Sequence, residues 1–174
     1  MFDISKSDVT ECKGPAHDGQ QPEEESCCYE SGNVYGRMGL MMNKIKERSW
    51  DTCVAFHGHE CGGLTIGYKA ALYAVKLLEL AFSEDEQVVC ISENDACGVD
   101  AIQVMLGCSI GKGNLLFHMT GKQAFSFYCR STGRSVRLVL REKPQGMTKE
   151  EAFGYYQSRT PEELFEVKKT AIPL

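Results

Sequence analysis

The chain has 174 residues, of which 43% are apolar and 25% charged, and its net charge at pH 7 is −5. This length and balance are typical of a soluble globular protein with one or two domains. The acidic balance leaves no basic surface for nucleic acid, and no stretch supplies the ~18 uncharged apolar residues of a membrane span. We therefore expect neither a nucleic-acid nor a membrane partner.

The acidity is concentrated at the start of the chain. Residues 1–36 carry eight carboxylates and two lysines, so this segment has a charge of −6 and the remainder a charge of +1. Its apolar content is low, and it lacks the basic start and apolar centre of a secretory signal. We expect a flexible acidic extension over residues 1–36 and one folded domain over residues 37–174.

The nine cysteines do not indicate a disulfide scaffold, because their number is odd and no secretory signal precedes them. A reducing cytoplasm is the expected location. In that compartment a cysteine fills the core, binds a metal or acts as a reactive thiol.

Apolar spacing predicts a helix from Asn43 to Phe56 and a longer helix from Leu64 to Phe82. A β-branched run predicts a buried strand over Gln87–Ser92, and a helix over Gly98–Leu106 follows it. Three strands are then expected at Asn114–His118, Gln123–Arg130 and Ser135–Leu140, and Thr148 and Thr160 begin two further helices. This order predicts an α+β domain rather than an alternating α/β repeat.

The segment His57-Gly58-His59-Glu60-Cys61 places two imidazoles and a thiol at alternate positions. Alternate side chains of an extended loop share a face, so all three could reach one ion, and imidazole with thiolate suits Zn²⁺. The same alternation turns Glu60 toward solvent, although it could instead act as a general base. Cys61 also precedes the long helix, whose N-terminus favours a thiolate. The plainer alternative is a helix corner with surface histidines and a half-buried cysteine.

Cys97 has a similar setting, between the end of a strand and the start of a helix. Thiols at two helix starts could face each other across a cleft. A tetrahedral site of His57, His59, Cys61 and Cys97 is chemically reasonable, and three of these ligands with an open position would be typical of a catalytic site. A packed, inert Cys97 is an equally good reading of this segment.

Three segments together resemble the FmdE/FwdE subunit family of formylmethanofuran dehydrogenase over about residues 43–168: FHGHECGGLTIGYKAA, VVCISENDACGVDAIQVMLGCSIGKGNLLF and TGKQAFSFYCRSTGRSVRLVL. The resemblance implies an α+β core with a mixed sheet, an intertwined homodimer, and a metal or active site at His57, His59, Cys61 and Cys97, with Cys108 a weaker candidate. The family usually has proline where Gly62 stands. No cysteine follows Cys129, so the chain looks like a core-only member without the C-terminal zinc ribbon.

This resemblance implies a protein that binds zinc, or another divalent transition metal, and has an accessory or catalytic role in anaerobic one-carbon metabolism. It could act with other subunits of a dehydrogenase, and its reaction stays open, with Cys61 and Cys97 as candidate catalytic residues. One alternative is a thiol redox or sulfur-carrier protein in which these two cysteines form a reversible disulfide. Another is a non-enzymatic metal sensor or scaffold. The aromatic strand Gln123–Arg130 further favours a homodimer, because such a strand is better buried than exposed.

Overall fold

The computed structural model describes residues 48–169. The helices are α2 (Trp50–His57), α3 (Gly62–Leu78), α4 (Gly98–Leu106), α5 (Lys149–Ser158) and α6 (Pro161–Leu164), and the strands are β1 (Val88–Ser92), β2 (Leu115–Phe117), β3 (Ala124–Cys129), β4 (Ser135–Leu140) and β5 (Phe165–Lys168). None of the described helices combines the length and apolarity needed to cross a bilayer. The predicted acidic extension and the domain boundary after residue 36 lie outside the described residues.

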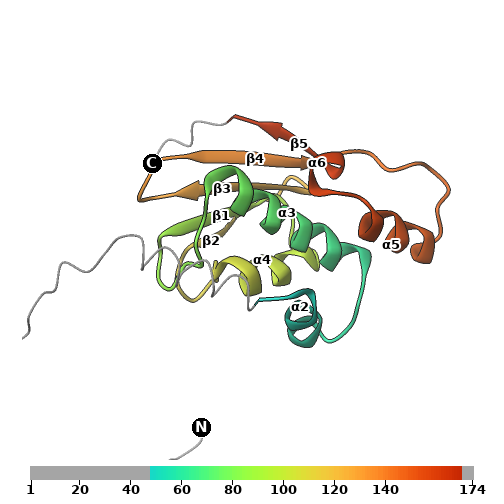
Figure 1. Cartoon of the computed structure of the whole chain (residues 1–174), viewed down its shortest axis with the longest axis horizontal. Coiled ribbons are helices and arrows are strands. Elements are labelled where there is room, and N and C mark those ends of the chain that lie inside the picture. Colours follow the sequence, from blue (N-terminus) through green and yellow to red (C-terminus); the bar gives the residue numbers. More distant parts are fainter. Residues whose placement is uncertain (1–47, 170–174) are drawn as a thin grey trace, which may run out of the picture. The chain divides into compact units, whose positions relative to one another are not determined.

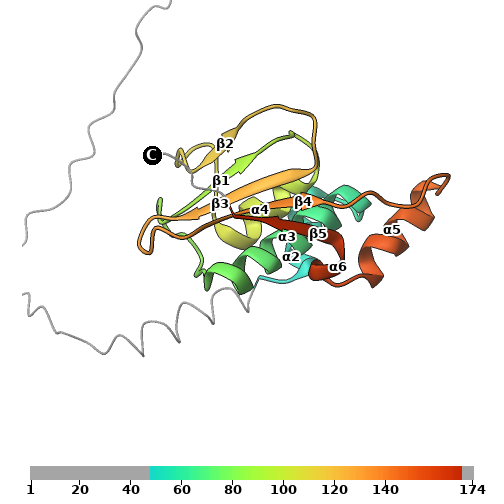
Figure 2. The same cartoon turned by 90° about the horizontal axis from the view of Figure 1, so that it is seen from above.

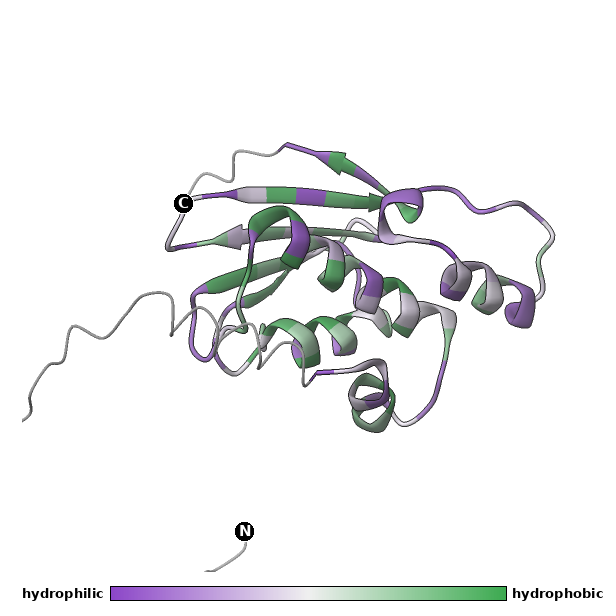
Figure 3. Ribbon diagram, viewed as in Figure 1, coloured by the Kyte–Doolittle hydropathy of each residue, from purple (hydrophilic) through white to green (hydrophobic). Residues whose placement is uncertain are grey.

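The five strands form one mixed sheet in the order β2-β1-β3-β4-β5. β1 and β2 are parallel, and the other three neighbouring pairs are antiparallel. α3 packs against β3 and β4, and α4 lies beside α3 (Figures 1 and 2). Hydrophobic residues are concentrated in β1, β3 and α4, whereas α5 is largely hydrophilic (Figure 3). The α+β class and the mixed sheet are therefore confirmed.

The strand count is one place where the prediction was wrong, because four strands were expected and the sheet has five. β5 pairs antiparallel with β4, with Phe165 opposite Leu140. Only Phe165 of this strand is buried, and the other three residues, two of them charged, are exposed. A four-residue edge strand of this composition carries too little apolar alternation to be recognised in a sequence.

The aromatic strand is an inner strand of the sheet. β3 is hydrogen-bonded to β1 on one side and to β4 on the other, and Phe125 and Phe127 are completely buried. The fold itself thus covers the side chains for which a second copy of the chain was expected. The edge strands are instead β2 and β5, and on β2 the side chains of Leu116 and Phe117 are 47% and 40% exposed.

The two longer core helices approach each other through bare backbone. A Cβ atom added to Gly67 of α3 would lie 1.9 Å from the carbonyl oxygen of Gly98, the first residue of α4. No side chain fits at this crossing, so only glycine allows the two helices to pack this closely. The crossing lies near the N-terminal end of each helix, where the two predicted site cysteines stand.

Candidate metal centre

Cys61 is the N-cap residue of α3. Its backbone is extended, with φ −156° and ψ 162°, and its sulfur accepts a hydrogen bond from the backbone N–H of Leu64 at 3.3 Å. A thiol here takes the place that serine or aspartate usually fills at a helix start. The N–H groups of the first turn have no partner within the helix, so the sulfur of Cys61 satisfies one of them and is held in place at the helix start.

Cys97 immediately precedes α4 but caps it differently. Its backbone is right-handed helical, and its side chain makes no capping hydrogen bond. Burial raises the pKa of the Cys97 thiol, and its hydrogen bond with Cys61 raises this pKa further. A Cβ atom on Gly63 would lie 3.1 Å from the Cβ of Cys97, which is a tight contact, and at ordinary contact distance from both sulfurs. Gly63 therefore lets Cys97 lie close to the start of α3.

His57, the last residue of α2, connects the thiols to a carboxylate. Its Nδ1 lies 2.7 Å from Oδ2 of Asp100, and its Nε2 lies 3.7 Å from the sulfur of Cys61. With Nδ1–H donating to Asp100, the lone pair of Nε2 is directed toward the thiols. The imidazole is well shielded, with only 11% of its side chain exposed. This arrangement is that of a metal-binding histidine held by an outer carboxylate.

The sequence analysis missed Asp100. A signal was present, because Asp100 stands three residues after Cys97, and side chains at that spacing share one face of a helix. The role of Asp100 depends on α2, however, because its partner His57 is 43 residues away in the sequence. Only the folded chain brings the two together.

The donor atoms of His57, Cys61 and Cys97 all lie within 4.8 Å of one another. A tetrahedral zinc ion, at its usual distances from sulfur and nitrogen, would separate those two ligand atoms by about 3.6 Å. The observed separation between Cys61 and His57 is 3.7 Å. Two thiols and one imidazole also form a donor set that zinc and similar borderline metals prefer. The residues present thus fit such an ion.

His59, the fourth predicted ligand, is not part of this group of three. Its ring lies against the ring of His57, with the centroids 4.6 Å apart, and it faces the cavity beside the thiols. The loop geometry also differs from the expected alternation, because His57 belongs to a helix and Gly58 caps that helix with φ 93°. His57 and Cys61 meet across this turn rather than along an extended segment.

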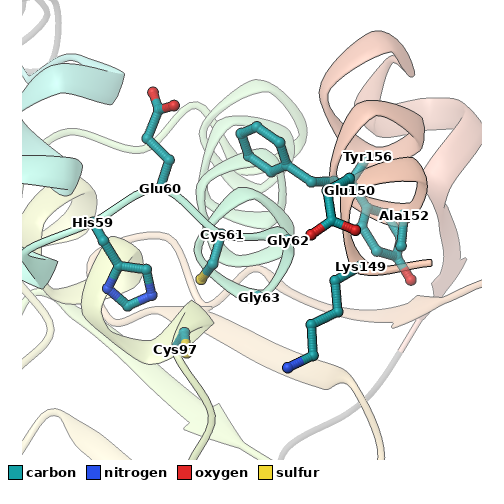
Figure 4. Close-up of a pocket in the computed structure, with 11 residues that line it drawn as sticks. His59, Glu60, Cys61, Gly62, Gly63, Cys97, Lys149, Glu150, Ala152 and Tyr156 are labelled. Atoms are coloured by element: carbon teal, nitrogen blue, oxygen red, sulfur yellow. The ribbon is translucent and has the colours of Figure 1, made fainter.

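Two other candidates lie away from the group. Glu60 accepts a hydrogen bond from the indole N–H of Trp50 at 2.9 Å, and it points away from the thiols (Figure 4). Cys108 is completely buried and donates to the carbonyl of Val88, and burial raises the pKa of its thiol to about 12. Cys108 is therefore packed as a core residue.

A cavity of about 590 Å³ opens beside the two thiols. Cys61 and Cys97 form one side of it, and α5 forms the other through Lys149, Phe153 and Tyr156 (Figure 4). A Cβ atom on Gly62 would lie 3.3 Å from the Tyr156 ring, so the glycine lets α5 approach α3 closely. The cavity is large enough for a small metabolite.

Comparison with known proteins identifies relatives of this domain. Residues 56–171 match the family model described as FmdE, molybdenum formylmethanofuran dehydrogenase operon. A probable S-adenosyl-L-methionine-binding protein of Archaeoglobus fulgidus is 26% identical over 116 residues, which is 64% of this chain and 30% of that protein. The chain thus spans less than a third of the length of this curated relative.

A solved structure has the same fold. It is the crystal structure of an FmdE-like protein of the tungsten formylmethanofuran dehydrogenase type from Syntrophus aciditrophicus, with 24% identity and a TM-score of 0.54. The alignment covers 78% of this chain and 73% of the other. The family match begins at residue 56 and so includes the three grouped donors and Asp100.

Proposed function

Because the chain belongs to the FmdE family, we propose that it is a metal-binding protein in which His57, Cys61 and Cys97 hold one divalent transition-metal ion, with zinc favoured by the donor set. The observation that carries this proposal is the convergence of three donor atoms from three helix ends. When bound, such an ion supplies a Lewis acid with room for one more ligand.

The surrounding residues have separate tasks in this proposal. Asp100 holds the His57 ring so that Nε2 faces the thiols, while the crossing of Gly67 over Gly98 brings the starts of α3 and α4 together. The Leu64 N–H donates to the Cys61 sulfur and fixes its position at the start of α3. His59 stands beside the group at the cavity wall, where it could act as a fourth ligand or contact a bound molecule.

Metal analysis of anaerobically purified protein tests this proposal. We expect nearly one equivalent of metal in the wild type and its loss in Cys61→Ser and Cys97→Ser. Cys129→Ala is the matched control, because Cys129 is a thiol outside the group of three. Chelator should lower the Tm of the wild type and of this control, because the metal stabilises only the folded chain. Full metal content in both serine variants would contradict the proposal.

The metabolic role extends the same proposal. The family model carries the name of a formylmethanofuran dehydrogenase operon, and we assign the chain an accessory or catalytic role beside such a dehydrogenase in anaerobic one-carbon metabolism. A cytoplasmic homodimer is part of this assignment, supported by the exposed apolar side chains on the open edge of β2. Sedimentation at micromolar concentration tests the dimer, and co-purification with dehydrogenase subunits tests the role. A monomer mass would contradict the dimer.

The proximity of the two thiols favours a second candidate function. Cys61 and Cys97 could form a reversible disulfide, with two electrons and two protons passing to a thiol-disulfide partner. Metal-free protein with a titratable Cys61–Cys97 disulfide would support this redox function over the metal-binding one. A metal sensor or scaffold, in contrast, would bind the ion tightly and leave no open coordination position.

A further inference from the structure

The cavity beside the thiols has chemically different sides. Cys61 and Cys97 line it, whereas His57 does not, so a molecule in the cavity approaches the group of three from its sulfur side. The opposite wall belongs to α5 and carries the aromatic rings of Phe153 and Tyr156. A small molecule with an apolar body therefore fits between the thiols and α5.

The charged side chains that line the cavity differ in whether they already have a partner within the protein. Glu60 is already hydrogen-bonded to Trp50. Lys149 contributes the cavity's one lysine or arginine side chain, and its ammonium forms no hydrogen bond or ion pair with another described residue. Its side chain reaches from α5 into the space in front of the thiols, while the Glu150 carboxylate lies beside Gly62 (Figure 4).

Building on the proposed metal site, we propose that this cavity binds a small organic carboxylate, with its carboxylate paired to the Lys149 ammonium and its other end at the Cys61–Cys97 side. The unpartnered ammonium supplies the charge complement, and the aromatic wall covers the apolar body. The Glu150 carboxylate would repel an anion. Whether the cavity prefers an anionic or a cationic ligand therefore tests the proposal directly.

Three thiol probes of similar size separate the possibilities on cobalt-substituted protein: 3-mercaptopropionate, its neutral amide, and cysteamine, which carries an ammonium group. Their binding is read from the cobalt absorption spectrum. We expect the wild type to bind the acid about fivefold more tightly than the amide, as one solvent-accessible charge pair would give. Cysteamine should bind most weakly.

The variants assign this preference to one side chain. Lys149→Met should bring the ratio of acid to amide affinity close to 1. Lys143→Met should keep the wild-type ratio, because it removes the same charge from an exposed lysine that does not line the cavity. Equal binding of acid and amide by the wild type, tighter binding of cysteamine, or a preference that survives in Lys149→Met would each overturn the proposal.

A metal-free experiment separates failure of the cavity proposal from failure of the metal site. If the protein takes up no cobalt, the metal-binding function fails, and the cavity is tested by exchange with 3,3′-dithiodipropionate. The Cys61 thiolate attacks one probe sulfur, a mixed disulfide forms, the probe disulfide breaks, and one 3-mercaptopropionate leaves. Mass spectrometry should show faster exchange for this dianion than for its bis-amide, and a loss of that difference in Lys149→Met. Equal rates for the two probes in the wild type would overturn the cavity proposal.

Discussion

The cysteines at the helix starts differ from those in the core by the partners that each sulfur has. The Cys61 sulfur accepts an N–H of the first turn of α3 and lies 3.7 Å from an imidazole nitrogen. Cys53, Cys90 and Cys108 are completely buried. Burial raises the pKa of Cys53 to about 11 and that of Cys108 to about 12, so these thiols stay protonated.

Cys129 shows that burial alone does not decide the state of a thiol. It is only 8% exposed, and burial by itself would raise its pKa. Hydrogen bonds from Ser131 and Thr132 to its sulfur nevertheless leave that pKa below the ordinary value. The comparison teaches that donors close to a sulfur can together outweigh its burial, as they do at Cys129 but not at Cys53 or Cys108.

The contrast between the helix-start cysteines and the core cysteines depends on how close the starts of α3 and α4 lie. The largest effect is therefore expected when these two helix starts are separated. Gly67→Ala would place a methyl group 1.9 Å from the Gly98 carbonyl oxygen, so α3 and α4 must move apart. We expect the free energy of unfolding to fall by about 3 kcal/mol. We also expect the proposed metal binding to be lost. Urea denaturation and metal analysis measure the two effects.

Gly154→Ala is the matched control for this substitution. Gly154 lies inside α5, and an added Cβ meets nothing within 4 Å. The same methyl group should there raise stability by about 0.5–1 kcal/mol, because alanine favours a helix more than glycine does. Equal stabilities for the two variants would show that the helix crossing does not need glycine.

Local patterns predicted much of the fold. The predicted bounds of α4 and β4 agree with the structure, because Gly107 ends the helix in a left-handed conformation and the 131–134 turn precedes the strand. The long helix was predicted to continue to Phe82, but it ends at Leu78, where Glu79 adopts φ 54°. A left-handed glutamate is uncommon, and nothing in the local sequence indicates it.

The site was predictable only in part, for a related physical reason. The HGHEC segment and the position of Cys97 before a helix identify candidate ligands by residue type and spacing. The sequence cannot show that Gly67 and Gly98 touch, or that Asp100 meets His57, because both contacts depend on how three helices pack. Whether the selected residues bind metal stays a prediction.

The next largest effect is expected from Asp100. Asp100→Asn keeps the shape of the side chain but weakens its hydrogen bond with His57 Nδ1. We expect metal affinity to fall about 10- to 100-fold, as is typical when the outer partner of a histidine ligand is changed. Competition with a chromogenic chelator measures the dissociation constant.

A neighbouring residue controls for the lost charge. Asp95→Asn removes the same negative charge two residues before Cys97, at an exposed position. Affinity should stay close to that of the wild type, and Asp100→Glu should recover part of the loss. If Asp95→Asn weakened binding as much as Asp100→Asn, the effect would come from charge rather than from orientation of the imidazole.

The buried thiols predict a smaller effect at alkaline pH. The folded-state pKa of Cys108 is raised by burial from 9.0 to about 12, so folding favours the protonated thiol. The resulting stabilisation is complete below the unfolded pKa near 9 and is lost as pH rises toward 12. The free energy of unfolding should therefore be lower by roughly 1 kcal/mol at pH 10. Denaturation between pH 8 and pH 10.5 should show a shallower loss in Cys108→Ala than in the wild type. Parallel curves would refute the role of Cys108.

The smallest expected effect concerns His59 and decides between three and four protein ligands. His57 belongs to the group of three donors and is held by Asp100, whereas His59 is exposed and only stacks on the His57 ring. His57→Ala should therefore remove most metal binding, while His59→Ala should weaken it only a few-fold, because the remaining ligands keep their geometry.

Glu60→Gln should leave binding unchanged, since an amide oxygen can still accept the Trp50 N–H. Equal losses in the two histidine variants would make His59 a ligand. Loss in Glu60→Gln with normal binding in His59→Ala would instead require a site built around the carboxylate.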